Sequence, residues 1–156
     1  MELEELIGKF AANAGIENVQ AVEGVWKFSA DGNVFGVMDD DTGGRVWLFG
    51  DIAATDVSRK DALVKAAMEA NYFYRGTGGA TFSLNPDTGN LTLFDSRPLD
   101  GLDEKGFYSF VEKFVNALAT WNAIAEAAGA LPESSNDTPP SDMSQDKFAT
   151  SGFLAV

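Results

Sequence analysis

The chain has 156 residues, a hydrophobic content of 45% and a formal net charge of -13, with 24 acidic residues against 11 basic ones. This size suits one compact domain with a single core, and the scattered Lys and Arg residues argue against nucleic acid as a partner. The absence of His and Cys excludes disulfides, His or thiolate metal sites, and Ser-His-Asp or Cys-His triads. We therefore expect no enzyme, no metal site and no cofactor.

The N-terminal segment Met-Glu-Leu-Glu-Glu-Leu-Ile is acidic, whereas a secretory signal begins with basic residues. No apolar stretch approaches the ~20 residues of a membrane span. We expect a cytoplasmic protein without membrane insertion. Its acidic charge suits either solubility or a basic partner.

The first predicted element is a helix over residues 2–14, followed by Gly15 at the position of a helix-capping glycine. Its apolar residues recur at helical spacing: Leu3, Leu6, Ile7, Phe10, Ala11 and Ala14. Three strands follow, over 25–30, 34–38 and 46–53. Asp31-Gly32 predicts a tight hairpin and the loop 41–44 a looser one, which together make an antiparallel meander.

These three strands carry large apolar residues on both faces, whereas a sheet packed on one core normally alternates apolar with polar residues. One face must be core, so the other is a candidate groove for an extended partner chain. Gly36 and Gly50 allow close approach of helices, which favours a groove on the opposite face: Phe35, Val37, Trp47 and Phe49. For each residue, ordinary core remains the alternative. Leu6 and Phe10 could extend the groove or simply anchor the first helix to the sheet.

A second helix is predicted from Ser58 to about Arg75, before the glycine-rich residues 76–79. Met68 and Tyr72 lie on one flank of this helix and are candidates for a twofold interface, where such residues are enriched. A solvated edge is the alternative. Two short strands over 80–84 and 90–96 then form a hairpin around the loop 85–89.

The longest helix is predicted over 103–128, where apolar residues recur at alternating spacings of four and three. From Gly129 the composition shifts to Pro, Ser, Asn and Asp, which cannot support a packed core. We therefore expect a folded domain over 1–131 and a tail over 132–156. Phe153 and Leu154, near the apolar end of this tail, could occupy a groove and compete with a partner.

This order of elements in an acidic chain resembles the Tir chaperone family, the class I type III secretion chaperones. The resemblance covers about residues 2–128 and is strengthened by three segments: Ala70-Asn71 before the glycine loop, the hairpin 82–94 with Leu91-Thr92-Leu93, and the helix segment 110–121.

The resemblance implies an α+β fold and a homodimer in which the second helix and the fifth strand, here Met68, Tyr72 and Leu93, meet their symmetry mates. It also implies a bacterial cytoplasmic chaperone that keeps an extended N-terminal segment of a secreted effector protein competent for export. The grooves for this segment would be made by the first helix and the first three strands.

Two other functional classes are compatible with the sequence. A YbjN-like regulatory or protein-binding domain would share the fold without a link to secretion. An enzyme with a carboxylate pair such as Asp95 and Asp100 would require a deep pocket in which two acids converge. The acidic loop around Asp39-Asp40-Asp41 lacks the spacing of a calcium-binding EF-hand and is typical of a hairpin turn.

Overall fold

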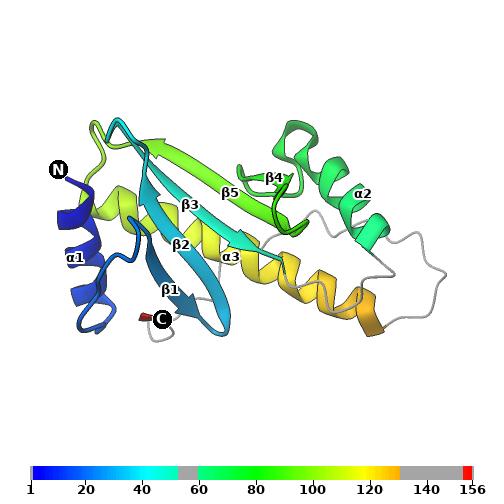
Figure 1. The fold of residues 1–156 in the computed structure, drawn as a ribbon, viewed down its shortest axis with the longest axis horizontal. Coiled ribbons are helices and arrows are strands. Elements are labelled where there is room, and N and C mark those ends of the chain that lie inside the picture. The colour runs from blue at the N-terminus through cyan, green and yellow to red at the C-terminus, as the bar shows by residue number, and fades with distance from the viewer. Residues whose placement is uncertain (1, 53–59, 131–152, 156) are drawn as a thin grey trace.

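The computed structural model describes residues 2–52, 60–130 and 153–155, which form an α+β fold (Figure 1). The elements are α1 (Leu3–Asn13), β1 (Trp26–Ala30), β2 (Asn33–Asp39), β3 (Arg45–Asp51), α2 (Lys60–Asn71), the short 3-10 helix η2 (Tyr72–Tyr74), β4 (Thr81–Leu84), β5 (Leu91–Pro98), α3 (Glu104–Ala130) and β6 (Phe153–Ala155). The predicted fold class and element order are confirmed, and β6 is an additional strand. The predicted helix start at Ser58 and domain end at Leu131 lie outside the described residues.

The strands form one antiparallel sheet in the order β4-β5-β3-β2-β1-β6. The predicted meander β1-β2-β3 lies at its centre. Asp31 and Gly32 both have positive φ, 49° and 83°, as expected for a two-residue hairpin whose twist matches that of its strands. The β4-β5 hairpin joins the meander beside β3, and β6 pairs with β1 at the far edge.

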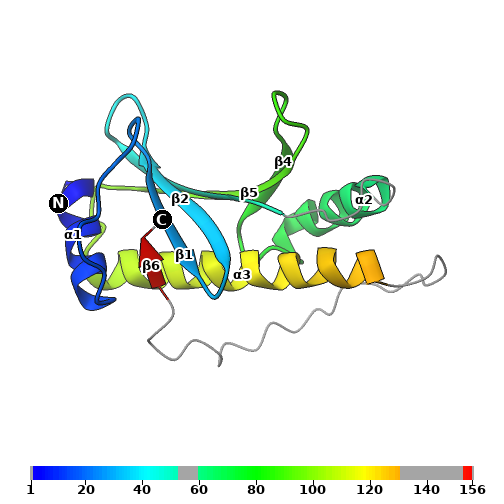
Figure 2. The ribbon, with the colours of Figure 1, turned by 60° about the horizontal axis from the view of Figure 1, so that its bottom comes forward.

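The helices leave one face of the sheet uncovered. Figures 1 and 2 show α3 running along one face of the sheet, with α1 near one end of α3 and α2 towards the other. No helix of the described chain lies on the opposite face, which we name the outer face. Because α3 carries a continuous apolar stripe, the covered face of the sheet packs against this helix.

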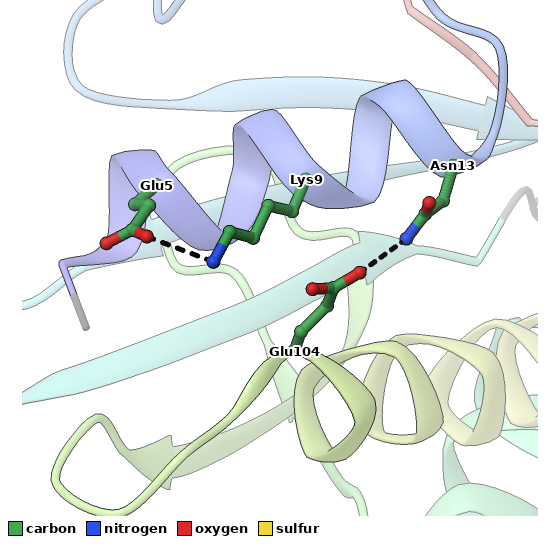
Figure 3. Close-up of polar contacts among 4 residues, drawn as sticks. All are labelled: Glu5, Lys9, Asn13 and Glu104. Atoms are coloured by element: carbon green, nitrogen blue, oxygen red, sulfur yellow. Dashed lines mark hydrogen bonds and ion pairs between the residues drawn. The ribbon is translucent and has the colours of Figure 1, made fainter.

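The α1 helix is anchored to both the sheet and α3. The ring of Phe10 meets those of Phe28 and Phe107 edge to face, with centroids 5.4 and 5.9 Å apart. At the end of the helix, the Asn13 side-chain amide donates a hydrogen bond of 2.7 Å to Glu104 at the start of α3 (Figure 3). These contacts fix α1 across the first turns of α3.

The other end of the core is organised around Trp121 of α3, which is fully buried. Its indole N–H donates a hydrogen bond of 2.9 Å to the carbonyl of Gly76, and its ring packs edge to face on Phe82 at 4.7 Å. A buried indole normally finds a partner for its N–H. Trp121 therefore joins α3 to β4 and to the glycine-rich loop after α2.

Candidate protein-binding surfaces

The pairing register of the meander decides which side chains face outwards. Gly36 lies opposite Phe49, and Met38 lies opposite Trp47. Residues directly opposite in an antiparallel pair point to the same face. The outer face of these two strands therefore includes Gly36, Met38, Trp47 and Phe49.

The predicted groove set of Phe35, Val37, Trp47 and Phe49 is wrong as a single surface. Phe35 and Val37 are each 1% exposed and lie in the core, whereas Trp47 and Phe49 are half-buried on the opposite face. The error comes from the loop 41–44, whose four residues place odd-numbered positions of β2 opposite even-numbered positions of β3.

The two glycines that guided the prediction also lie on different faces. A Cβ atom on Gly50 would lie 2.8 Å from Leu118 of α3, so this glycine does allow close helix packing, as predicted. Gly36 instead accommodates the ring of Phe49, which lies across it on the outer face. A glycine in a strand thus marks close approach without indicating from which side.

Four apolar residues come together on the outer face, and we name them the outer-face patch: Met38, Trp47, Phe49 and Phe94. Trp47 and Phe94 are in ring contact, with centroids 6.1 Å apart. Phe94 was missed by the sequence reasoning, although its strand alternates buried Leu91 and Leu93 with half-buried Thr92 and Phe94. An apolar patch that its own chain leaves partly open is typical of a protein-binding surface.

The structure does not bring Leu6 and Phe10 to this patch. Leu6 is completely buried, and Phe10 is enclosed by the aromatic contacts with Phe28 and Phe107. Their assignment to partner binding is therefore wrong for this conformation. The alternative interpretation, that they anchor α1 to the sheet, is the one that the contacts support.

The end of α2 forms a second apolar surface. Met68 is 47% exposed, Tyr72 61% and Phe73 75%. The rings of Tyr72 and Phe73 meet edge to face with centroids 4.6 Å apart, and the guanidinium of Arg75 lies 5.3 Å from the Tyr72 ring centroid. Leu93, by contrast, is completely buried on the core face of β5, so its side chain does not reach a dimer surface.

The backbone at this surface is strained. Phe73 and Tyr74 have φ angles of 51° and 56°, in the left-handed region that bulky side chains rarely adopt. Such strain persists only where neighbouring contacts impose it. Asn71 provides one such contact, because its side-chain amide accepts the N–H of Phe82 at 2.7 Å and donates to the Phe82 carbonyl at 3.1 Å. The strained turn directly follows this anchored residue and carries the exposed aromatic rings.

Residues 5–122 match the Tir chaperone protein (CesT) family. The chain belongs to this family. No curated protein sequence matches it significantly.

The solved structures that resemble this Tir chaperone family member share its fold at low sequence identity. A chain of the HopA1-SchA chaperone-effector complex is 14% identical with a TM-score of 0.61, covering 77% of this chain and 92% of that one. A chain of the ExsC-ExsE complex is 16% identical with a TM-score of 0.62, covering 80% and 97%. An uncharacterized protein from Methanothermobacter thermautotrophicus is 13% identical with a TM-score of 0.55, covering 80% and 96%.

The acidic loop of this family member is held as a turn. The Asp40 carboxylate accepts the N–H of Gly44 at 2.8 Å and the hydroxyl of Thr42 at 2.9 Å. The hydrogen bond from the Gly44 N–H lowers the pKa of Asp40. The carboxylate is thus engaged in the turn, and the described part of the chain has no acidic cluster suited to holding a metal ion.

Asp95, proposed above as one member of a carboxylate pair, is half-buried on β5. Burial raises the pKa of its carboxyl, while the N–H of Ser96 donates a hydrogen bond of 2.7 Å to it. Asp100 is exposed in the turn before α3.

Among the described helices, none has the length and hydrophobicity to cross a membrane.

Proposed function

We propose that this Tir chaperone family member binds an extended N-terminal segment of a type III secreted effector in the bacterial cytoplasm and keeps that segment competent for export. The observation that carries the proposal is the outer-face patch, in which Trp47, Phe49 and Phe94 lie side by side on a face that none of the described helices covers. A structurally similar chain comes from a chaperone-effector complex, HopA1-SchA. An unfolded segment with apolar side chains suits this surface because binding would bury the apolar side chains of both the segment and the patch.

The mechanism is equilibrium masking without turnover. Apolar side chains of the effector become buried against the patch, which stabilises the complex by ~25 cal/mol per Å² of apolar surface removed from water. Ordering the segment costs part of this free energy, because a disordered chain loses conformational entropy when it binds. The segment remains unfolded while bound and is therefore ready for export after release.

Charge determines how the partner arrives. The net charge of -13 produces a field that attracts a basic segment and repels an acidic one. Salt screens such long-range attraction over about 10 Å at 0.1 M. We expect the association rate with a basic effector segment to fall steeply as the salt concentration rises, and a flat dependence would refute this steering.

We further propose a homodimer that forms through the exposed flank of α2. Met68 and Tyr72 are separated by one helical turn, and Phe73 extends the same exposed surface. Met and aromatic residues are enriched in the buried centres of interfaces. A dimer would cover these rings and present two outer-face patches to one long effector segment.

The test is purification of the chain with its partner from the native bacterium. Trp47→Ser removes the centre of the outer-face patch, whereas Lys27→Ser changes an exposed residue on the same sheet face and serves as the matched control. We expect the wild-type chain and the Lys27→Ser variant to retain a secreted effector, protected from protease along its N-terminal segment. Trp47→Ser should lose it. Equal retention by all three proteins would contradict binding at the outer face.

A YbjN-like regulatory domain is the second candidate. The fold is also found in the uncharacterized Methanothermobacter thermautotrophicus protein, which matches with a TM-score of 0.55. Because fold alone does not determine function, the identity of the purified partner separates the two proposals. A partner that is not secreted would favour the regulatory protein.

A further inference from the structure

The described C-terminal residues extend the sheet at its β1 edge. Phe153 lies opposite Ala30, Leu154 opposite Ser29, and Ala155 opposite Phe28, so that β6 pairs with β1 in antiparallel orientation (Figure 2). Sheet edges expose backbone N–H and C=O groups that can pair with another chain. In this chain, its own terminal segment covers that edge.

The register shows which backbone groups make this pairing. Ala30 and Asn33 flank the two-residue hairpin loop and therefore form a hydrogen-bonded pair between β1 and β2. Backbone direction alternates along an antiparallel strand, so the N–H and C=O of Ser29 point away from β2 and towards β6. Ser29 and Leu154 consequently form the hydrogen-bonded pair between β1 and β6.

The two edges of the sheet are covered in different ways. At the β4 edge, Asn71 at the end of α2 makes two hydrogen bonds with the backbone of Phe82. Asn71 precedes Phe82 by only eleven residues, so this cover is local. At the β1 edge, the cover is a three-residue strand that is separated from α3 by residues 131–152. Because a few backbone hydrogen bonds contribute little net free energy, the strand at β1 is the cover that another segment can replace.

The sequence of the terminal segment indicates what fits at this edge. The last charged residue of the chain is Lys147, and residues 148–156 read Phe-Ala-Thr-Ser-Gly-Phe-Leu-Ala-Val. These nine residues carry no charged side chain, in contrast to the 24 acidic residues elsewhere in the chain. In strand addition, the affinity comes from backbone hydrogen bonds. A segment that lacks proline and carries no negative charge is therefore suited to this edge.

We propose that the β1 edge is a strand-addition site, that Phe153–Ala155 is its resident occupant, and that a short uncharged apolar segment of the partner replaces this occupant on binding. The inference rests on the proposed function for the identity of the partner. It assigns to the C-terminus a self-complementing role: the terminal strand closes the sheet edge until a partner strand displaces it. The predicted groove occupancy by Phe153 and Leu154 thus becomes occupancy of a sheet edge.

The test compares two full-length variants at the same position. Leu154→Pro removes the backbone N–H that pairs with Ser29, whereas Leu154→Val retains that N–H and is the matched control. The probe is a fluorescently labelled peptide with the sequence of residues 150–156. We expect the peptide to bind Leu154→Pro at least tenfold more tightly than it binds the wild-type chain or Leu154→Val. Equal binding to all three proteins, or binding to none, would overturn the proposal.

Hydrogen exchange gives an independent measurement without a probe. The amide of Ser29 should exchange at least tenfold faster in Leu154→Pro than in the wild-type chain and Leu154→Val. The protection in the wild-type chain should not depend on protein concentration. Protection that rises with concentration would assign the strand to a second copy of the chain and would overturn a resident occupant from the same chain.

These measurements separate the inference from the proposed function. If the peptide binds as expected but the purified partner is not a secreted effector, the strand-addition site stands and the secretion function fails. If an effector is retained but the peptide does not discriminate between the variants, the function stands and the terminal strand is not the occupant. The peptide measurement uses the Leu154 variants and the partner purification uses the Trp47 and Lys27 variants, so that only the wild-type chain is common to the two tests.

Discussion

Replacing Phe35 with Ala tests the assignment of the two sheet faces. Phe35 is buried between the ring of Phe28, with centroids 5.6 Å apart, and the ring of Phe114 at 6.5 Å. Truncating a buried Phe to Ala typically costs about 3–5 kcal/mol, because the cavity left behind collapses only partly. The two aromatic pairs are included in that loss.

Phe49→Ala is the comparison, since Phe49 is the same residue type on the neighbouring strand. Its ring lies over Gly36 on the outer face and is half-buried. Fully burying such a side chain is worth about 1.5–3 kcal/mol, so its truncation should cost no more than about half of that range. We therefore expect Phe35→Ala to reduce the unfolding free energy by about 1.5–4 kcal/mol more than Phe49→Ala.

Urea unfolding followed by far-UV circular dichroism measures this difference directly. The total unfolding free energy of a domain is about 5–15 kcal/mol, so Phe35→Ala could remain folded or could unfold; Phe35→Leu retains part of the volume and keeps the comparison measurable. Partner binding should show the opposite order, with Phe49→Ala weakening it and Phe35→Leu leaving it intact. Equal stability losses for the two positions would refute the assignment of faces.

Three further outcomes follow from particular contacts. Gly50→Ala should lower the unfolding free energy by about 1–3 kcal/mol, measured by urea unfolding, because its Cβ would lie 2.8 Å from Leu118; a neutral effect would mean that α3 lies farther from β3. Burial raises the pKa of Asp95 above its ordinary value of 3.8, so its charged form opposes folding and the stability associated with this group is lost as the pH rises through the raised pKa. Asp95→Asn should therefore melt at a higher temperature than the wild-type chain at pH 7, with a gain that diminishes as the pH falls through the raised pKa and has disappeared below 3.8, and a gain independent of pH would contradict this origin. Met68→Glu and Tyr72→Glu should yield folded monomers in sedimentation experiments, and an unchanged dimer would refute the proposed interface.

The helices of this chain could be predicted from its sequence because their apolar spacing is long and regular. The first helix was expected over residues 2–14 and runs from Leu3 to Asn13, and the last was expected over 103–128 and runs from Glu104 to Ala130. The apolar stripe of α3 is buried as predicted, including Phe107, Leu118 and Trp121. Helical periodicity thus determined both the position and the buried face of these elements.

The faces of the meander could not be predicted in the same way. The sequence of one strand shows that its odd-numbered residues point to one face and its even-numbered residues to the other. Whether the odd or the even residues of the next strand share that face depends on the loop that joins the two strands. If Asp40 had paired with Val46 in place of Arg45, so that five residues closed the loop, Phe35 and Phe49 would have lain on the same face. The residues Asp39-Asp40-Asp41-Thr42-Gly43-Gly44 are compatible with turns of several lengths. The sequence therefore does not show which two residues close the loop.

The turn after α2 escaped prediction for a different reason. Phe73 and Tyr74 adopt left-handed φ angles, which local sequence preference disfavours for aromatic residues. The pairing of Asn71 with Phe82 involves residues on two elements and is visible only after both are packed. Strain of this kind is a property of tertiary contacts, and it brings exposed rings to the surface that we propose for the dimer.

The outer-face patch and the β1 edge, which we propose as binding sites for the partner, lie on the same sheet. This arrangement links the specificity of partner binding to partner release. The outer-face patch binds apolar side chains, whereas the β1 edge binds backbone, so an extended segment that crosses from one to the other would use both. Side-chain burial selects an apolar partner, while backbone pairing at Ser29 is available only after β6 has left. Since β6 belongs to the same chain, it can return to the edge whenever the partner dissociates. Such a chaperone would bind its partner at both the outer-face patch and the β1 edge, and at the β1 edge its own strand β6 would compete with the partner.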